Sequence, residues 1–116
     1  MDRRKELKEL YKQMKPDMGI FIIRSNSKNK CYIDSTKDLK STLNSTKFKL
    51  EAGSHPNREL QKDWKENGEM AFTIEILEKL EYDKDESKED YSEELALLKM
   101  IWEEKLIRGG MEFYKK

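Results

Sequence analysis

The most informative stretch of the sequence is GIFIIRSNSKNKCYID, residues 19–34. Residues 20–23 are a short run of β-branched and aromatic side chains, and residues 31–33 form a second such run. Between them lie residues 25–29, whose serine and asparagine content is typical of a turn. We therefore expect two strands joined as a hairpin.

The segments around this hairpin predict helices and one more strand. Apolar residues recur at helical spacing in four segments, residues 2–15, 37–49, 58–66 and 92–107. Asn57 is the expected cap of the third helix, which Gly68 ends. Residues 72–77 alternate between apolar and polar side chains, as a half-buried strand does. Helices mixed with antiparallel strands indicate an α+β protein.

The predicted architecture is a small three-stranded antiparallel sheet flanked by helices, with an N-terminal helix and a long C-terminal helix. A length of 116 residues fits a single domain, residues 1–116. We divide it into an N-terminal helix, a core motif region, an acidic loop and a C-terminal helix, at residues 1–15, 18–81, 82–91 and 92–107.

The composition excludes several classes of protein. The single cysteine, Cys31, allows neither an internal disulfide nor a cysteine-based zinc site. No apolar run approaches the ~20 residues that a membrane span needs, and the charged start does not resemble a signal peptide. We therefore expect a cytoplasmic protein that has no membrane partner.

The charges are balanced overall but unevenly distributed. Asp and Glu are concentrated in residues 81–94, whereas residues 24–49 contain seven basic side chains: Arg24, Lys28, Lys30, Lys37, Lys40, Lys47 and Lys49. A basic cluster of this kind is a candidate surface for phosphates, although solvated faces of a charge-rich protein give the same pattern.

Two tripeptides in the hairpin resemble the paired signature of the GIY-YIG nuclease family. They are Gly19-Ile20-Phe21 and Tyr32-Ile33-Asp34, and residues 35–40, 53–64 and 72–80 are also similar to that family. The resemblance covers roughly residues 5–107, and it implies a three-stranded antiparallel sheet with flanking helices. Active members of the family cleave DNA phosphodiesters with one divalent metal ion.

Carried over position by position, the resemblance implies that most of the catalytic side chains have been replaced. Tyr32 retains the tyrosine of the second tripeptide, whereas Phe21 replaces the tyrosine of the first. Thr42 falls at the position of the phosphate-stabilising arginine. Lys99 falls at the position of the metal-binding glutamate, where its ammonium group would repel a cation. Glu103, one helical turn later, is the only metal-ligand candidate that we retain.

Three interpretations follow from these replacements. The first is an endonuclease-like domain that has lost cleavage, needs no cofactor and retains weak, salt-sensitive binding of double-stranded DNA through the seven basic residues. The second is an active endonuclease with displaced ligands, for which Mg²⁺ or Mn²⁺ would be the cofactor. The third is a protein-interaction or scaffold domain that does not bind DNA.

Overall fold

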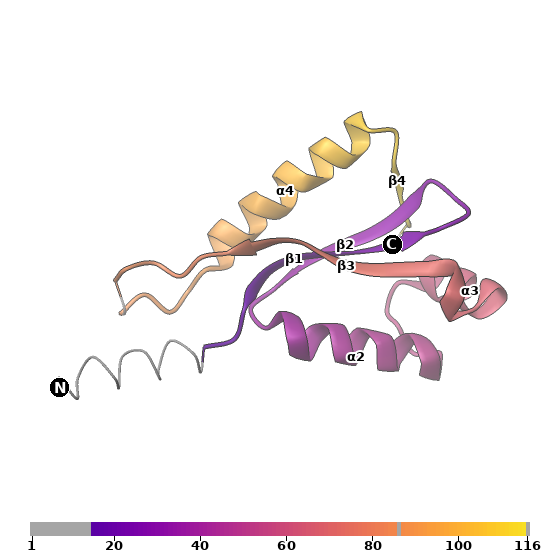
Figure 1. Ribbon diagram of the computed structural model, residues 1–116, viewed down its shortest axis with the longest axis horizontal. Helices are drawn as coiled ribbons and strands as arrows, with labels where there is room; N and C mark the ends of the chain where they lie inside the picture. Colours follow the sequence, from indigo (N-terminus) through magenta and orange to yellow (C-terminus); the bar gives the residue numbers. More distant parts are fainter. Residues whose placement is uncertain (1–14, 86, 116) are drawn as a thin grey trace.

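The computed structural model describes residues 15–85 and 87–115. Along the chain its elements are β1 (Met18–Ser25), β2 (Lys30–Thr36), α2 (Leu39–Ala52), α3 (Arg58–Asn67), the 3-10 helix η1 (Glu69–Ala71), β3 (Phe72–Leu80), α4 (Ser92–Arg108) and β4 (Glu112–Phe113). The α+β class is therefore confirmed (Figure 1). The helix predicted at the N-terminus falls on residues 1–14, outside the described residues.

The sheet differs from the prediction, because it has four strands and is mixed. The strand order is β3-β1-β2-β4, with β1 antiparallel to both β2 and β3 and β4 parallel to β2. After α4 the chain turns at Gly110, whose φ is +87°, and Glu112 and Phe113 then pair with the start of β2. A two-residue strand has no alternation to detect, which is why the sequence did not reveal it.

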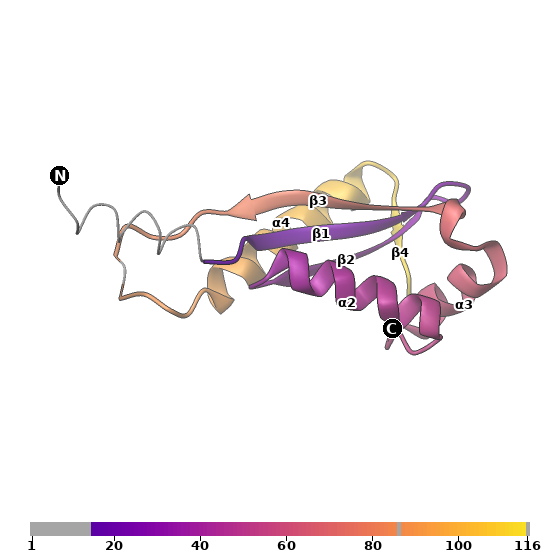
Figure 2. The same cartoon turned by 60° about the horizontal axis from the view of Figure 1, so that its bottom comes forward.

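Helices cover both faces of the sheet. Figure 1 places α4 on one side, with α2 and α3 on the other, and Figure 2 shows the same layers from a second direction. The central strand β1 is buried on both faces: Phe21 and Ile23 belong to the core under α2 and α3, and Ile20 and Ile22 to the core under α4. A strand buried on both faces needs no polar alternation, which explains the continuous apolar run of residues 20–23.

Side-chain caps set the starts of α2 and α3. Asp38 accepts a hydrogen bond from the Ser41 amide at 3.1 Å, so α2 begins later than the predicted residue 37. Its end lies at Gly53, whose φ of +79° is in the left-handed region. Asn57 caps α3, as the sequence predicted, by accepting a hydrogen bond from the Leu60 amide at 3.0 Å.

The last helix also differs in detail from the prediction. It extends to Arg108 rather than residue 107, and it is followed by β4, so it is not the last element of the chain. No helix among the described residues is long and apolar enough to cross a membrane.

β3 forms one edge of the sheet and is irregular. Ile20 pairs with Glu78 and Phe21 with Ile76, so Leu77 has no partner in β1. Ile76 is 43% exposed, although residues 72–77 alternate as a half-buried strand does.

Candidate functional site

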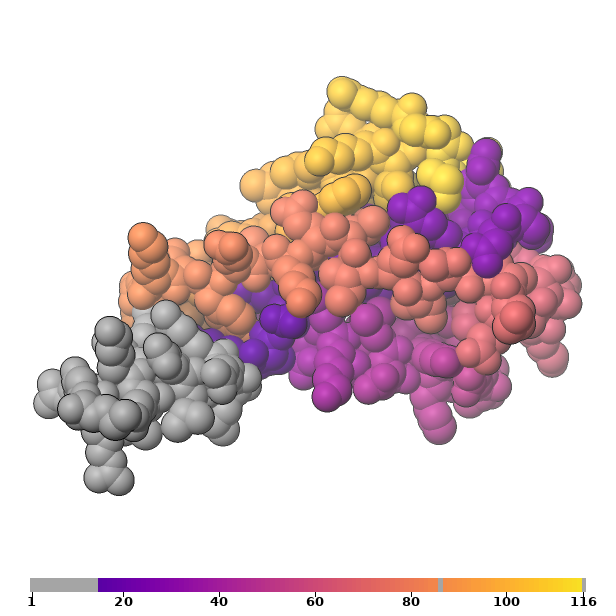
Figure 3. Space-filling view, in the orientation of Figure 1, coloured from indigo at the N-terminus to yellow at the C-terminus, as the bar shows by residue number. Residues whose placement is uncertain are grey.

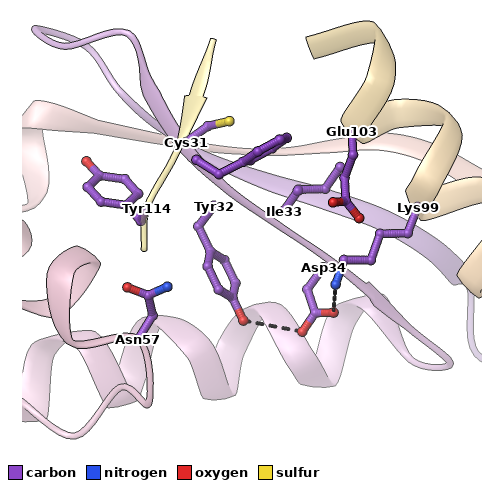
Figure 4. A pocket seen from close by; sticks show the side chains of 9 residues that line it. Cys31, Tyr32, Ile33, Asp34, Asn57, Lys99, Glu103 and Tyr114 are labelled. Carbon is purple, nitrogen blue, oxygen red and sulfur yellow. Dashed lines mark hydrogen bonds and ion pairs between the residues drawn. The ribbon is translucent and has the colours of Figure 1, made fainter. Parts of the chain in front are cut away.

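A cleft of about 420 Å³ lies at the open edge of β2. β4 pairs only with Lys30 and Cys31, so no strand of the described chain pairs with this edge beyond that point. α4 forms one wall and the start of α3 another (Figure 4). The lining residues are Cys31, Tyr32, Ile33, Asp34, Asn57, Lys99, Glu103, Phe113 and Tyr114.

Three of the predicted site positions, Tyr32, Lys99 and Glu103, line this cleft together with Asp34. The hydroxyl of Tyr32 donates a hydrogen bond to Asp34 Oδ2 at 3.3 Å, and Lys99 Nζ lies 3.5 Å from Asp34 Oδ1. Figure 4 shows Lys99 reaching from α4 toward Asp34 on β2. Asp34, the last residue of the second tripeptide, and Lys99 therefore form an ion pair.

Tyr32 lies in surroundings that favour its neutral form. Its ring packs edge-on against His55, with the centroids 5.1 Å apart, and lies 6.4 Å from the ring of Phe21. Burial, the negative charge of Asp34 and the hydrogen bond to Asp34 together raise the pKa of Tyr32 to about 12. The hydroxyl therefore remains protonated at neutral pH.

His55 has a local structural role. Its Nδ1 accepts a hydrogen bond from the Asn57 amide at 3.0 Å, and its own amide donates to Gln61 Oε1 at 2.9 Å. Burial lowers the pKa of His55 from its usual value. Because Nδ1 is already an acceptor, the neutral ring carries its proton on Nε2.

Phe21 and Thr42 do not line the cleft. Phe21 is buried in the core under α2 and α3. Thr42 lies on α2, where its Oγ1 is 2.6 Å from Thr36 Oγ1, so the two hydroxyls join the start of α2 to the end of β2. Thr42, which the resemblance assigned to the position of the phosphate-stabilising arginine, is thus a short side chain that is already hydrogen-bonded.

The donor set of the cleft does not fit a divalent metal ion. Its carboxylates are Asp34 and Glu103, and the ammonium group of Lys99 already neutralises Asp34. Magnesium prefers oxygen ligands such as these carboxylates. A magnesium ion bound here would either displace Lys99 from Asp34 or lie beside the positive charge of Lys99, which would repel it. Within residues 15–85 and 87–115, no group of three or more His, Cys, Asp or Glu side chains is placed to hold a metal ion.

The seven basic residues are divided between two faces and are partly paired. Strand alternation places Arg24 on the face of Ile22, toward α4, whereas α2 on the opposite face carries Lys40, Lys47 and Lys49. Three ion pairs engage acids of α3 and η1: Lys28 with Asp63 at 3.1 Å, Lys30 with Glu59 at 2.7 Å and Lys47 with Glu69 at 3.0 Å. Within the described part of the chain, Arg24, Lys37, Lys40 and Lys49 form no ion pair.

Several lining residues were not identified from the sequence. Asn57 was assigned only a capping role, while Phe113 and Tyr114 reach the cleft because β4 returns to β2. The contact between His55 and Tyr32 joins a loop to a strand. No local pattern marks such contacts, since they depend on how distant segments pack.

The ionisation of Tyr32 can be checked directly. We expect the ultraviolet pH titration of the protein minus that of Tyr32→Phe to show one tyrosine with a midpoint near pH 12. Asp34→Asn removes a negative charge and should lower that midpoint toward the ordinary value of 10.0. A midpoint near 10.0 in the unmodified protein would contradict the described surroundings of the hydroxyl.

Comparisons with known proteins give two structural matches. No protein-family model and no curated protein matches the sequence. The chain is similar to the catalytic domain of the homing endonuclease I-TevI, with a TM-score of 0.64 and 25% identity over 85% of this chain and 99% of that one. It is also similar to a mutant catalytic domain of the intron endonuclease I-TevI, with a TM-score of 0.61 and 28% identity over 78% of this chain and 84% of that one. I-TevI is a GIY-YIG homing endonuclease, and the chain has a GIY-YIG-like nuclease fold.

Proposed function

We propose that this protein is a nuclease-like domain that has lost phosphodiester cleavage and retains weak, salt-sensitive binding of double-stranded DNA. The observation that carries the proposal is the ion pair between Asp34 and Lys99 across the cleft. It places a positive charge among the carboxylates that would otherwise be the available ligands of a metal ion.

Water activation lacks a suitable base. A general base works best when its pKa is near the operating pH. The pKa of Tyr32 is raised to about 12, and Phe21 has no hydroxyl group. Asp34 is in turn engaged by Tyr32 and Lys99. Each group at the motif positions is either apolar or already paired, which supports the loss of activity.

Stabilisation of the reacting phosphate is also weakened. Phosphoryl transfer depends on positive groups that neutralise charge on the phosphate oxygens, and losing one such group often lowers the rate by ~10²–10³. Thr42 offers only a hydroxyl, which already lies 2.6 Å from that of Thr36. Lys99 is positive, but its charge is directed at Asp34.

DNA binding rests on the basic residues that form no ion pair with the described part of the chain. Lys37 and Lys40 lie at the start of α2 and are both exposed. Lysine contacts to phosphates give affinity without sequence preference, and the affinity falls as salt rises because counterions are released. The resemblance to the catalytic domain of I-TevI adds support for a nucleic-acid ligand.

Two measurements test the proposed function. The first is binding of a labelled DNA duplex in EDTA at low and at moderate salt, for which we expect binding that weakens steeply with salt. The second is plasmid nicking in Mg²⁺ or Mn²⁺, for which we expect none. Metal-dependent nicking that is lost in Glu103→Ala would favour the active endonuclease. Absence of duplex binding at low salt would favour the scaffold domain.

The ion pairs predict which lysines bind DNA. A lysine without an ion pair among the described residues should contribute more than a paired one. The double variant Lys37→Ala with Lys40→Ala should weaken duplex binding, and the slope of log affinity against log salt should become shallower by about one per lost phosphate contact. The matched control, Lys28→Ala with Lys30→Ala, removes equal charge from lysines that are paired with Asp63 and Glu59. It should have the smaller effect, and an equal effect would show that the ion pairs do not distinguish these lysines.

A further inference from the structure

α4 carries apolar side chains on two opposite sides. Its inner side packs against the sheet through Leu95, Leu98, Trp102 and Leu106. On its outer side Leu97, Met100 and Ile107 are 60%, 65% and 60% exposed. A helix that is apolar on more than one side is usually covered on each of them. The outer side of α4 is therefore a candidate contact surface.

The exposed residues form a regular seam. Glu93, Leu97, Met100, Glu104 and Ile107 alternate in steps of four and three residues, which is the spacing of helices that pair along their length. At 100° per residue, these positions lie opposite those that face the sheet. Figures 1 and 3 show α4 on the outside of the molecule, with its outer side uncovered by the described elements.

We propose that this seam binds the same seam on a second copy of the chain, with the two α4 helices antiparallel. Charge complementarity favours a second copy of the chain as the partner, and it favours the antiparallel arrangement of the two α4 helices. The first turn of α4 is acidic, with Glu93 and Glu94, and its last turn is basic, with Lys105 and Arg108. An antiparallel pair places each acidic end beside a basic end, and Met100 lies near the two-fold axis.

A parallel pair is disfavoured by the same residues. It would place Glu93 against Glu93 and Glu104 against Glu104, and like charges that face each other across a helix pair are destabilising. Arg108 pairs with Glu104 of its own helix at 2.7 Å, but both side chains are largely exposed. Because such pairs contribute under about 1 kcal/mol, Arg108 is available to a partner.

The seam is separate from the cleft. Lys99 and Glu103 lie on the side of α4 that lines the cleft, and none of the cleft residues belongs to the seam. The dimer therefore leaves both clefts open and does not depend on the proposed function. Seventeen residues of helix are ~26 Å long, so contact between two helices alone is small, and the dimer should be weak.

Sedimentation of the full chain over a wide concentration range tests the dimer. We expect a reversible monomer–dimer equilibrium, which Met100→Lys should weaken at least tenfold by placing two ammonium groups near the axis. Phe48→Lys is the matched control, because Phe48 is 71% exposed on α2 and lies away from the seam. It should leave the equilibrium unchanged. Both replaced side chains are exposed, and thermal unfolding verifies that each variant is folded.

A charge exchange tests the antiparallel direction. Glu93→Arg and Arg108→Glu should each weaken the dimer, because each places like charges beside one another. The double variant should restore the dimer, because the opposite charges again meet across the pair. A chain that is monomeric at every concentration overturns the proposal. So does a dimer that Met100→Lys leaves intact, or single charge variants that the double variant does not rescue.

Discussion

Gly19→Ala is expected to destabilise the protein by about 1–3 kcal/mol or more. A Cβ atom added at Gly19 would lie 2.1 Å from the carbonyl oxygen of Glu78 and 2.9 Å from Lys79 Cα. Both atoms belong to the backbone of β3, so no side chain can rotate away to make room. The pairing of β1 with β3 must separate instead, next to the irregularity at Ile20 and Phe21.

Urea-induced unfolding measures this effect, with Gly109→Ala as the matched control. A Cβ at Gly109 would meet only the carbonyl oxygens of Leu106 and Lys105, each at an ordinary distance of 3.5 Å. The control should change the free energy of unfolding by no more than about 0.5 kcal/mol. Similar stability for Gly19→Ala and Gly109→Ala would contradict the close approach of β3. If the expectation holds, the first glycine of the signature is required for packing, whether or not the domain cleaves DNA.

Asp63→Ala is expected to lower the free energy of unfolding by roughly 2–3 kcal/mol. The carboxylate of Asp63 is only 5% exposed, and it joins α3 to the hairpin and to the C-terminal segment. It accepts hydrogen bonds from Tyr114 Oη at 2.5 Å, from Lys28 Nζ at 3.1 Å and from Asn67 Nδ2. Alanine would leave the hydroxyl of Tyr114 buried without this acceptor.

The contribution of Asp63 should also depend on pH. Burial raises the pKa of this carboxyl group, but the hydrogen bonds from Tyr114 and Lys28 outweigh burial, so the net pKa lies below the ordinary value of 3.8. A carboxyl group with a lowered pKa stabilises the folded state above the unfolded pKa, and this stability is lost as pH falls through the folded pKa. The stability gap between the protein and Asp63→Ala should therefore be full at neutral pH and narrow below pH 3.8.

Unfolding curves at several pH values check this expectation. Lys28→Ala is the control, because Lys28 is about half exposed and its ion pair should contribute under about 1 kcal/mol. A gap that stays constant down to strongly acidic pH would show that the carboxylate is not the source of the effect.

Local signals in the sequence were sufficient for much of the fold. The hairpin, the α3 helix and its Asn57 cap depend on neighbouring residues, whose patterns can be read directly. β4 could not be predicted, because its two residues are ordered by pairing with Lys30 and Cys31, far away in the chain.

The cleft was predicted only in part, for the same reason. The replacements at Phe21, Thr42 and Lys99 stay predictions from the sequence, and the ion pair between Lys99 and Asp34 depends on how α4 packs against β2. The charge count of residues 24–49 also omitted the acids of α3 and η1, which pair with Lys28, Lys30 and Lys47. The net charge of a segment is the sum over its own residues, whereas the electrostatic potential at the surface depends on which charges folding brings together.

Among the described residues no strand pairs with the outer edge of β3, and this has a consequence for aggregation. A nine-residue edge strand exposes unpaired backbone groups, which makes it a template for the strand of another molecule and so for aggregation. Here Glu75, Glu78 and Lys79 are exposed along β3, and Leu77 interrupts its regular pairing with β1. A second molecule that paired its own β3 with this edge would bring charged side chains close together. Its strand would also meet a backbone that is distorted at Leu77. The irregularity at Leu77 therefore helps to keep the sheet from growing between molecules.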